Sequence, residues 1–232
     1  MLPMRLRHAA AATALLLALA GCHTTVTGTS GDAASKTPTT RSAATTGTGP
    51  GAPLAYGPGP KSRYTVQAQP VPGSCHYGSD GGQPLPDPHC TPGALSPAVT
   101  QANLSSTICR KGGYTGGIRP PASITGKEKR ANAAAYGYTG SLGDAEYDHL
   151  VSLELGGDPN DPANLWVEPP SPGHKPGSGV NNPKDKVEST LHTAVCSGKV
   201  TLAAAQQAIA SDWATADQNL GLTTSSSTDG SD

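Results

Sequence analysis

Polar and apolar residues alternate from Tyr147 to Leu155 (YDHLVSLEL), with Tyr, His, Val, Leu and Leu at every second position. This pattern is typical of a strand with one buried face. Residues 156–162 are rich in Gly, Asp and Pro and predict a loop, and Asn164 to Glu168 (NLWVE) predicts a second short strand that ends at two prolines. The pattern therefore predicts two strands joined by a loop.

Two helices are expected after these strands, beyond a Pro- and Gly-rich loop at residues 169–180. The first is predicted to begin with Asn182 as N-cap and Pro183 in the first turn, and to end at Gly198. The second is predicted to begin at Thr201. The expected apolar faces consist of Val187, Leu191 and Val195 in the first helix and of Leu202, Ala205, Ile209 and Trp213 in the second.

An earlier helix is predicted where Thr125 and Glu128 have the spacing of a capping box, and Gly137 is expected to end it. The residues before it are Pro- and Gly-rich and give no clear element pattern. The predicted fold class is α+β: a strand–strand–helix unit, a second C-terminal helix, and an irregular N-terminal part held by disulfides.

Residues 1–22 have the pattern of an export signal, with basic Arg5 and Arg7 before an apolar run too short to span a bilayer. The run ends in Leu-Ala-Gly-Cys, which resembles a bacterial lipobox, and we expect Cys22 to be lipidated. A plain signal peptide is the alternative. The lipobox predicts a protein anchored to the outer face of the bacterial cytoplasmic membrane.

Composition sets the expected domain boundaries. Residues 23–63 consist mainly of Thr, Ser, Gly, Ala and Pro, and residues 218–232 end in TTSSSTDGSD, so both are predicted to be disordered. Residues 64–217 are predicted to form one folded domain. This part contains no Phe, which indicates a core that needs additional support.

Cysteine pairing is the expected support. Apart from Cys22, the chain has four cysteines, and exported proteins keep disulfides. Four cysteines allow three connectivities. We predict a local bridge, Cys75–Cys90, and a long-range bridge, Cys109–Cys196; a four-cysteine zinc site is the alternative, although paired Cys-x-x-Cys spacing is missing.

The net charge of −1 gives no overall basic field of the kind that attracts nucleic acid. Between Cys109 and Tyr147, however, basic residues exceed acidic ones. These basic residues are Arg110, Lys111, Arg119, Lys127, Lys129 and Arg130. The excess fits either a solvated face or an anionic ligand.

Asp148 and His149 are the strongest candidates for chemistry. A carboxylate is a hard ligand for a divalent cation, and an imidazole can accept a proton near neutral pH. A helix that begins near this pair would present free N–H groups to a phosphate. These parts suffice for phosphodiester hydrolysis.

The combination DH…LGG…NLW…NPKD resembles the motif of the HNH, or ββα-metal, endonucleases, with the ββα core at about residues 147–196. The longer stretch from about Gln67 to Trp213, which includes STICRKGGYTGGIRPP, is similar to a group of exported bacterial HNH-like proteins. The resemblance implies a nuclease that leaves 5′ phosphates. It also implies one divalent metal ion, Mg²⁺ first, with Mn²⁺, Ni²⁺ or Zn²⁺ as alternatives.

The resemblance assigns roles to individual residues. His149 would be the general base and Asn164 would orient it, while Asp148 would bind the metal. Asn182 best matches the second metal ligand. The substitutes for Asn182 are Asp185 and Glu188, and the expected phosphate-binding residues are Lys184 and Lys186. His174 and His192 are expected to be incidental.

Two features depart from the family pattern. The loop before Asn182 is longer and richer in Pro and Gly, and the helix lacks the family's last His. A regular strand would also send Asp148 and His149 to opposite faces, so the metal site requires the strand to end or bulge at this pair.

The leading hypothesis is a metal-dependent nuclease that acts on nucleic acid, DNA before RNA. The alternatives are a non-catalytic, disulfide-stapled surface binding module, and a hydrolase of another phosphoester.

Overall fold

The computed structural model describes residues 53–223. The predicted signal peptide, Cys22, and residues 23–52 of the predicted tether lie outside the described residues, as do residues 224–232 of the predicted tail. Within the described part, no helix is both long enough and apolar enough to cross a membrane.

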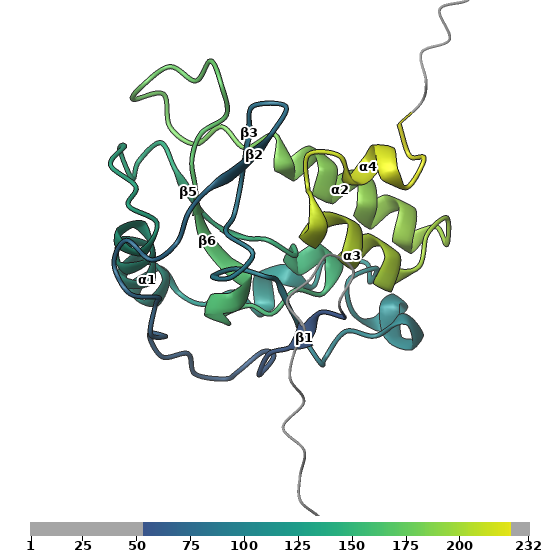
Figure 1. Ribbon diagram of the computed structural model, residues 1–232. Coiled ribbons are helices and arrows are strands. Elements are labelled where there is room, and N and C mark those ends of the chain that lie inside the picture. Colours follow the sequence, from purple (N-terminus) through teal and green to yellow (C-terminus); the bar gives the residue numbers. More distant parts are fainter. Residues whose placement is uncertain (1–52, 224–232) are drawn as a thin grey trace, which may run out of the picture. The chain divides into compact units, whose positions relative to one another are not determined.

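The described chain has an α+β fold, as predicted (Figure 1). Its helices are α1 (Ala122–Ala135), α2 (Lys184–Cys196), α3 (Leu202–Ser211) and α4 (Ala216–Asn219). Its strands form three two-stranded sheets: parallel β1 (Ala55–Tyr56) and β4 (Ala94–Leu95), and two antiparallel pairs, β2 (Gly78–Asp80) with β3 (Gln83–Leu85) and β5 (Glu146–His149) with β6 (Leu165–Glu168).

The first predicted strand is shorter than expected. β5 ends at His149, and Leu153–Leu155 form a 3-10 turn in place of more strand. The Asn164 side chain bonds both backbone groups of Val151, and the Ser152 hydroxyl accepts from the Glu154 N–H at 3.2 Å. These contacts turn the chain away from β6, so the buried leucines enter the core from a turn.

The β5–β6 hairpin lies between α1 on one side and the group of α2, α3 and α4 on the other (Figure 1). The larger apolar core joins that helical group to the turn after β5, through residues such as Val151, Leu155, Leu191 and Ile209. A smaller core packs Trp166 of β6 against Tyr136, which follows α1. The hairpin therefore meets α1 on one side, through β6, and the start of α2 on the other side, through β5.

The helix before the hairpin starts earlier than predicted. The expected capping box at Thr125 is wrong, because α1 begins at Ala122 directly after Pro121, which has an extended conformation. Glu128 instead accepts from the Gln67 N–H at 2.7 Å. The helix ends at Ala135, before Gly137 with its positive φ of 61°, as predicted.

The predicted start of the second of these helices is confirmed, since Thr201 is the N-cap of α3 and accepts from the Ala204 N–H at 3.2 Å. The predicted N-cap of α2 is one residue too early: Pro183 is the N-cap and the helix begins at Lys184, whose N–H donates to the Asn182 side chain at 2.9 Å. The prediction that Trp213 lies on the second helix is wrong, since α3 ends at Ser211. The Trp213 indole donates to the Pro84 carbonyl at 2.8 Å, which draws this side chain toward β3.

The folded part extends beyond residues 64–217 at both ends. Ala55 and Tyr56 form β1, and the Gly57 N–H donates to the Leu95 carbonyl at 2.9 Å. At the other end, α4 continues to Asn219, and Leu222 packs against the larger core. Pairing with distant strands and apolar contact with α2 and α3 stabilise these segments, which composition alone marks as tether and tail.

Both predicted disulfides are confirmed. Cys75 bonds to Cys90 across 15 residues, and Cys109 bonds to Cys196 across 87 residues. The first bridge joins the smaller core, and the second fixes the end of α2 to the segment before α1. The disulfides thus attach the irregular N-terminal half to the hairpin and helices.

Candidate functional site

Asp148 lies on the face of the hairpin that receives the start of α2. Its Oδ2 atom is 2.7 Å from the Nζ atom of Lys184, the first residue of that helix. Both side chains are buried. The strong local field of Lys184 keeps the pKa of Asp148 below its usual range even though burial opposes this shift.

The Lys184 ammonium binds three oxygen atoms. Besides Asp148 Oδ2, it donates to the His149 carbonyl at 2.7 Å and to Glu188 Oε1, one turn along α2. An ammonium has three donors, so all of them are used. We call Asp148, the His149 carbonyl, Glu188 and Lys184 the lysine cage.

Two further carboxyl groups border the lysine cage. Glu168 on β6 lies within hydrogen-bonding reach of Asp148, and burial together with the Asp148 charge raises its pKa well above the usual value. Its Oε2 atom is buried and has no hydrogen-bond partner among residues 53–223, which makes the charged form of Glu168 costly. Glu146 has a raised pKa for the same reason, burial first.

Glu188 is the second acidic member of the lysine cage. Burial, with a smaller contribution from the Asp148 charge, raises its pKa to about 7, and Lys184 opposes the rise. Glu188 therefore changes charge near neutral pH. The cage holds one permanent cation and one permanent anion, with a third group that titrates.

His149 points to the other face of the hairpin. β5 is regular through Asp148 and His149, which pair with Trp166 and Leu165, so successive side chains point in opposite directions. Of the two conditions stated for a shared metal site, a strand end or a bulge, the first is met because β5 ends at His149, and no bulge interrupts its pairing with β6. The sequence therefore places these two side chains next to each other, but the structure separates them by the thickness of the hairpin.

The His149 ring is held by a backbone carbonyl. Its Nε2 atom is 3.0 Å from the Pro159 oxygen, which can only accept, so Nε2 carries the proton and Nδ1 keeps its lone pair. Burial lowers the pKa of His149, although the Asp148 charge and the Pro159 bond oppose this shift. The ring is neutral at pH 7 and suited to accept a proton.

The loop that supplies the Pro159 carbonyl is buried and tied down by Asp158. Asp158 Oδ1 accepts from the Asn160 and Asp161 N–H groups, each at 2.9 Å, and Oδ2 accepts from the Gly59 N–H at 2.6 Å. Sequence reasoning treated Asp158 only as a loop residue. The Asp-Pro-Asn-Asp order is a signal for such a side-chain turn.

Gly157 explains the Gly-Gly of the motif. A Cβ atom at Gly157 would lie 1.7 Å from the Val151 carbonyl oxygen, so any side chain there would displace the loop. Gly156 has a positive φ of 75° and ends the 3-10 turn. The two glycines therefore allow the loop to fold back under β5.

Asn164 acts on the backbone after His149. Its side chain accepts from the Val151 N–H at 2.9 Å and donates to the Val151 and Asp158 carbonyls, each at 3.0 Å. These bonds join the chain after β5 to the loop that carries Pro159, and the role of Asn164 in orienting His149 stays a prediction. Asn164 touches neither ring nitrogen.

The predicted second metal ligand lies outside the lysine cage. Asn182 donates to Glu146 at 3.1 Å and accepts from the Lys184 N–H, while Asp185 is exposed at the helix start. Of the two predicted substitutes, only Glu188 joins Asp148. The prediction that Lys184 binds phosphate is wrong, because its ammonium is buried and fully bonded; Lys186 is exposed.

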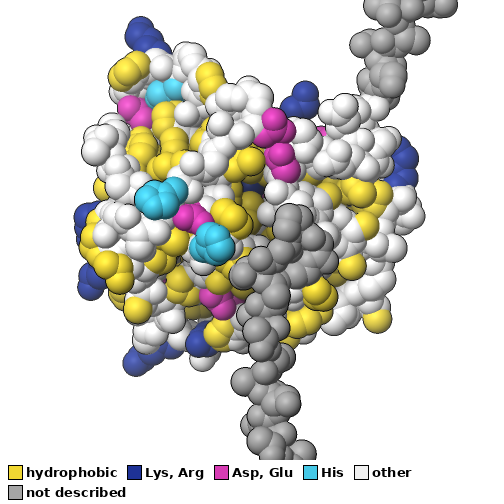
Figure 2. All heavy atoms as spheres, in the orientation of Figure 1, with side chains coloured by type: hydrophobic (Ala, Val, Ile, Leu, Met, Phe, Trp, Pro, Cys, Tyr) yellow, Lys and Arg dark blue, Asp and Glu magenta, His cyan; other side chains and the backbone are white. Residues whose placement is uncertain are grey.

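Arg119 is a site residue that the role assignment missed. It is exposed; its positive charge adds to the burial that lowers the pKa of His149, and it opposes the burial that raises the pKa of Asp185. It comes from the STICRKGGYTGGIRPP stretch, whose basic excess was the available signal. On the face shown in Figure 2, Lys and Arg side chains lie scattered near the margin and form no continuous patch.

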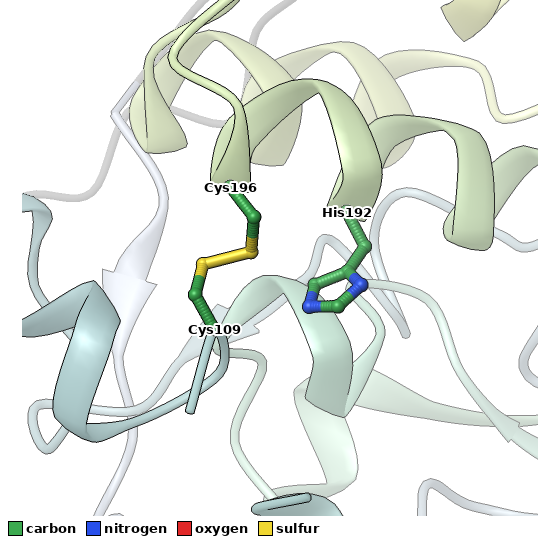
Figure 3. Close-up of side chains that lie close together, drawn as sticks. All are labelled: Cys109, His192 and Cys196. Carbon is green, nitrogen blue, oxygen red and sulfur yellow. A yellow bond between two sulfur atoms is a disulfide. The ribbon is translucent and has the colours of Figure 1, made fainter. Parts of the chain in front are cut away.

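One His/Cys group among residues 53–223 has metal-like spacing: Cys109, His192 and Cys196, whose ligand atoms lie within 4.8 Å of one another (Figure 3). Both sulfur atoms are consumed by the disulfide, and His192 Nε2 lies 2.9 Å from the Ile108 carbonyl. A disulfide offers no thiolate to a metal. This group supports the fold, as the incidental role predicted for His192 implies.

A cavity of about 50 Å³ lies beside the Asp158 loop, lined by Tyr64, Gln67 and Asn160 among others. Neither Asp148 nor His149 reaches it. The small volume fits water more closely than a nucleotide.

Compared with models of known protein families, with curated proteins and with solved structures, the chain matches none. The site must therefore be judged on its own geometry.

The metal that the HNH resemblance implies does not fit the lysine cage as it stands. Its donors are carboxylate and carbonyl oxygens, which suit Mg²⁺. The Lys184 ammonium, however, is bonded to Asp148, Glu188 and the His149 carbonyl at once. The position that a cation would take on Asp148 Oδ2 is already filled by a side chain.

Proposed function

We propose that the chain hydrolyses phosphodiester bonds of nucleic acid, with His149 as the general base. The observation that supports this is the Nε2 contact with the Pro159 carbonyl at 3.0 Å, which fixes the ring and leaves Nδ1 free. Asp158 and Asn164 hold the loop and strand end that make this contact. A fixed, neutral imidazole at a strand end is what proton abstraction from water requires.

The chemical step follows from this arrangement. His149 Nδ1 takes a proton from a water molecule, and the water oxygen bonds to phosphorus. The bond between phosphorus and the 3′ oxygen breaks, and the leaving oxygen takes a proton from solvent, which gives a 5′ phosphate and a 3′ hydroxyl. The exposed cations Arg119 and Lys186 are the residues that we assign to phosphate oxygens.

The test is cleavage by the purified full chain. Plasmid DNA and single-stranded RNA would be incubated with Mg²⁺, Mn²⁺ or EDTA, and we expect cleavage that His149→Ala lowers by about 10²–10⁴-fold. His174→Ala is the matched control, because His174 faces Asp144 and not the site. Equal cleavage by wild type and His149→Ala would refute the proposal.

The lysine cage favours a second candidate, a non-catalytic surface binding module. Lys184 neutralises Asp148 and closes the place of a metal ion, which is the arrangement expected if the scaffold serves binding alone. No cleavage under any metal condition, together with saturable binding of nucleic acid or cell-wall polymer, would support the module.

The proposed location is the outer face of the bacterial membrane, with Cys22 lipidated. The two disulfides agree with an oxidising compartment. Labelling of growing cells with a radioactive fatty acid should mark the wild-type chain, and Cys22→Ser should abolish the label.

A further inference from the structure

The start of α2 is an unusual place for a buried lysine. The first turn of a helix carries a partial positive charge, which disfavours a cation by about 0.3–1 kcal/mol. Lys184 is the first residue of α2 and is 0% exposed. Its place therefore calls for compensation from outside the helix.

The pair within the helix does not supply that compensation by itself. Lys184 precedes Glu188 by four residues, and helices prefer the opposite order. The main partners are instead Asp148 and the His149 carbonyl, both at 2.7 Å and both on β5. The ammonium thus joins the helix to the strand.

We propose that Lys184 is the resident cation of this site, and that a divalent ion can bind Asp148 only in a chain that lacks the Lys184 ammonium. The ammonium has three donors and contacts three oxygens, so all of its donors are used and it occupies the position that a metal ion would take between Asp148 and Glu188. This inference concerns cation binding and does not depend on the proposed nuclease activity.

Direct titration of the wild-type chain with Mn²⁺ is the first experiment. Calorimetry and Mn²⁺ electron paramagnetic resonance should detect no Mn²⁺ site at Asp148. Any Mn²⁺ binding by the wild-type chain should therefore be unchanged in Asp148→Asn. The unfolding temperature should be the same in Mn²⁺ and in EDTA. A wild-type site that disappears in Asp148→Asn would overturn the inference, since Lys184 would then yield to the metal.

Removal of the ammonium is the second experiment. Lys184→Met and Lys184→Gln should each gain one Mn²⁺ site, with an affinity at least about tenfold above that of wild type. If either variant is partly unfolded, saturating Mn²⁺ should raise its unfolding temperature by about 5 °C or more. The double variant Asp148→Asn/Lys184→Met is the control and should gain no site.

Lys199→Met is the matched surface control, because Lys199 is exposed and follows the end of α2 by three residues. It should leave Mn²⁺ binding unchanged. Absence of a new site and of thermal rescue in both Lys184 variants would overturn the inference, whatever the nuclease assay shows.

Discussion

Two helices hold the β5–β6 hairpin, and each does so with one buried polar side chain. On the α1 side, Asn132 accepts from the Val167 N–H at 2.7 Å and donates to the Leu165 carbonyl at 3.3 Å. On the α2 side, the Lys184 ammonium bonds Asp148, Glu188 and the His149 carbonyl. One contact is neutral and the other is made of charges.

The difference shows that the buried charges, and the raised pKa values that accompany them, lie on the α2 side of the hairpin. The Asn132 amide pairs with backbone groups and leaves no charge behind. The Lys184 side contains more carboxyl groups than cations. Burial raises the pKa values of Glu146, Glu168 and Glu188, and the negative charge of Asp148 adds to each rise. A neutral contact fixes a strand, whereas a charged cage also makes stability depend on pH.

Loss of the cage cation should have the largest effect. Lys184→Met leaves buried carboxylates without their partner, and we expect the free energy of unfolding to fall by about 3–5 kcal/mol. Urea denaturation at pH 7.5 measures this. The triple variant Asp148→Asn/Lys184→Met/Glu188→Gln removes the charges together and should recover most of the loss; a loss under about 1 kcal/mol in Lys184→Met would contradict the buried cage.

The pH dependence of stability should separate the two sides next. The pKa of Glu188 is raised to about 7 in the folded chain, so its stabilising contribution is complete below the unfolded value near 4.5. It is lost as pH rises through about 7, with a total on the order of 2–3 kcal/mol.

Urea denaturation between pH 4.5 and pH 8 checks this slope. Glu188→Gln should flatten it, whereas Asn132→Ala should keep it. If the free energy of unfolding of Glu188→Gln changed with pH as steeply as that of the wild type, groups other than Glu188 would cause the pH dependence.

Loss of the neutral contact should be smaller. Asn132→Ala leaves the buried Val167 N–H and Leu165 carbonyl with one partner fewer, which should lower the free energy of unfolding by about 1–2 kcal/mol at every pH tested. Chemical denaturation at pH 5 and pH 8 measures both values. A strongly pH-dependent loss would show that the α1 side is coupled to the cage.

The smallest expected effect concerns Arg119. Its charge lowers the pKa of His149, so Arg119→Gln should raise that pKa. If the chain is a nuclease, the acidic limb of the pH–rate profile should then move to higher pH, because a larger fraction of His149 is protonated. Rates between pH 5 and pH 9 measure this, with Lys127→Gln as an exposed control.

Local signals predicted the hairpin and the start of α3, where Thr201 caps the helix through a contact three residues away, and they placed the start of α2 within one residue. The cysteine count in a chain with an export signal predicted both disulfides. The Val151–Leu155 segment was assigned wrongly because its apolar alternation fits a strand, while Asn164 turns the chain from a distance of 13 residues.

The charge arrangement could not be predicted in this way. Lys184 and Asp148 are 36 residues apart, and an exposed lysine at a helix start is the usual expectation. The burial of Glu168 and the proximity of Arg119 to His149 also depend on packing. The Asp148–His149 motif identified the right strand, and strand alternation had indicated that a regular strand sends the two side chains to opposite faces, as β5 does.

The long disulfide has a consequence for proteolysis. The segment between Cys109 and Cys196 contains the hairpin, the exposed Pro/Gly loop before α2, and α2 itself, which begins with Lys184 and ends at Cys196. A protease that cuts this loop yields two pieces that remain covalently joined, and Lys184 stays tethered within reach of Asp148. Release of α2 requires both a cut and a reductant, so a nicked chain keeps its parts together as long as its surroundings are oxidising.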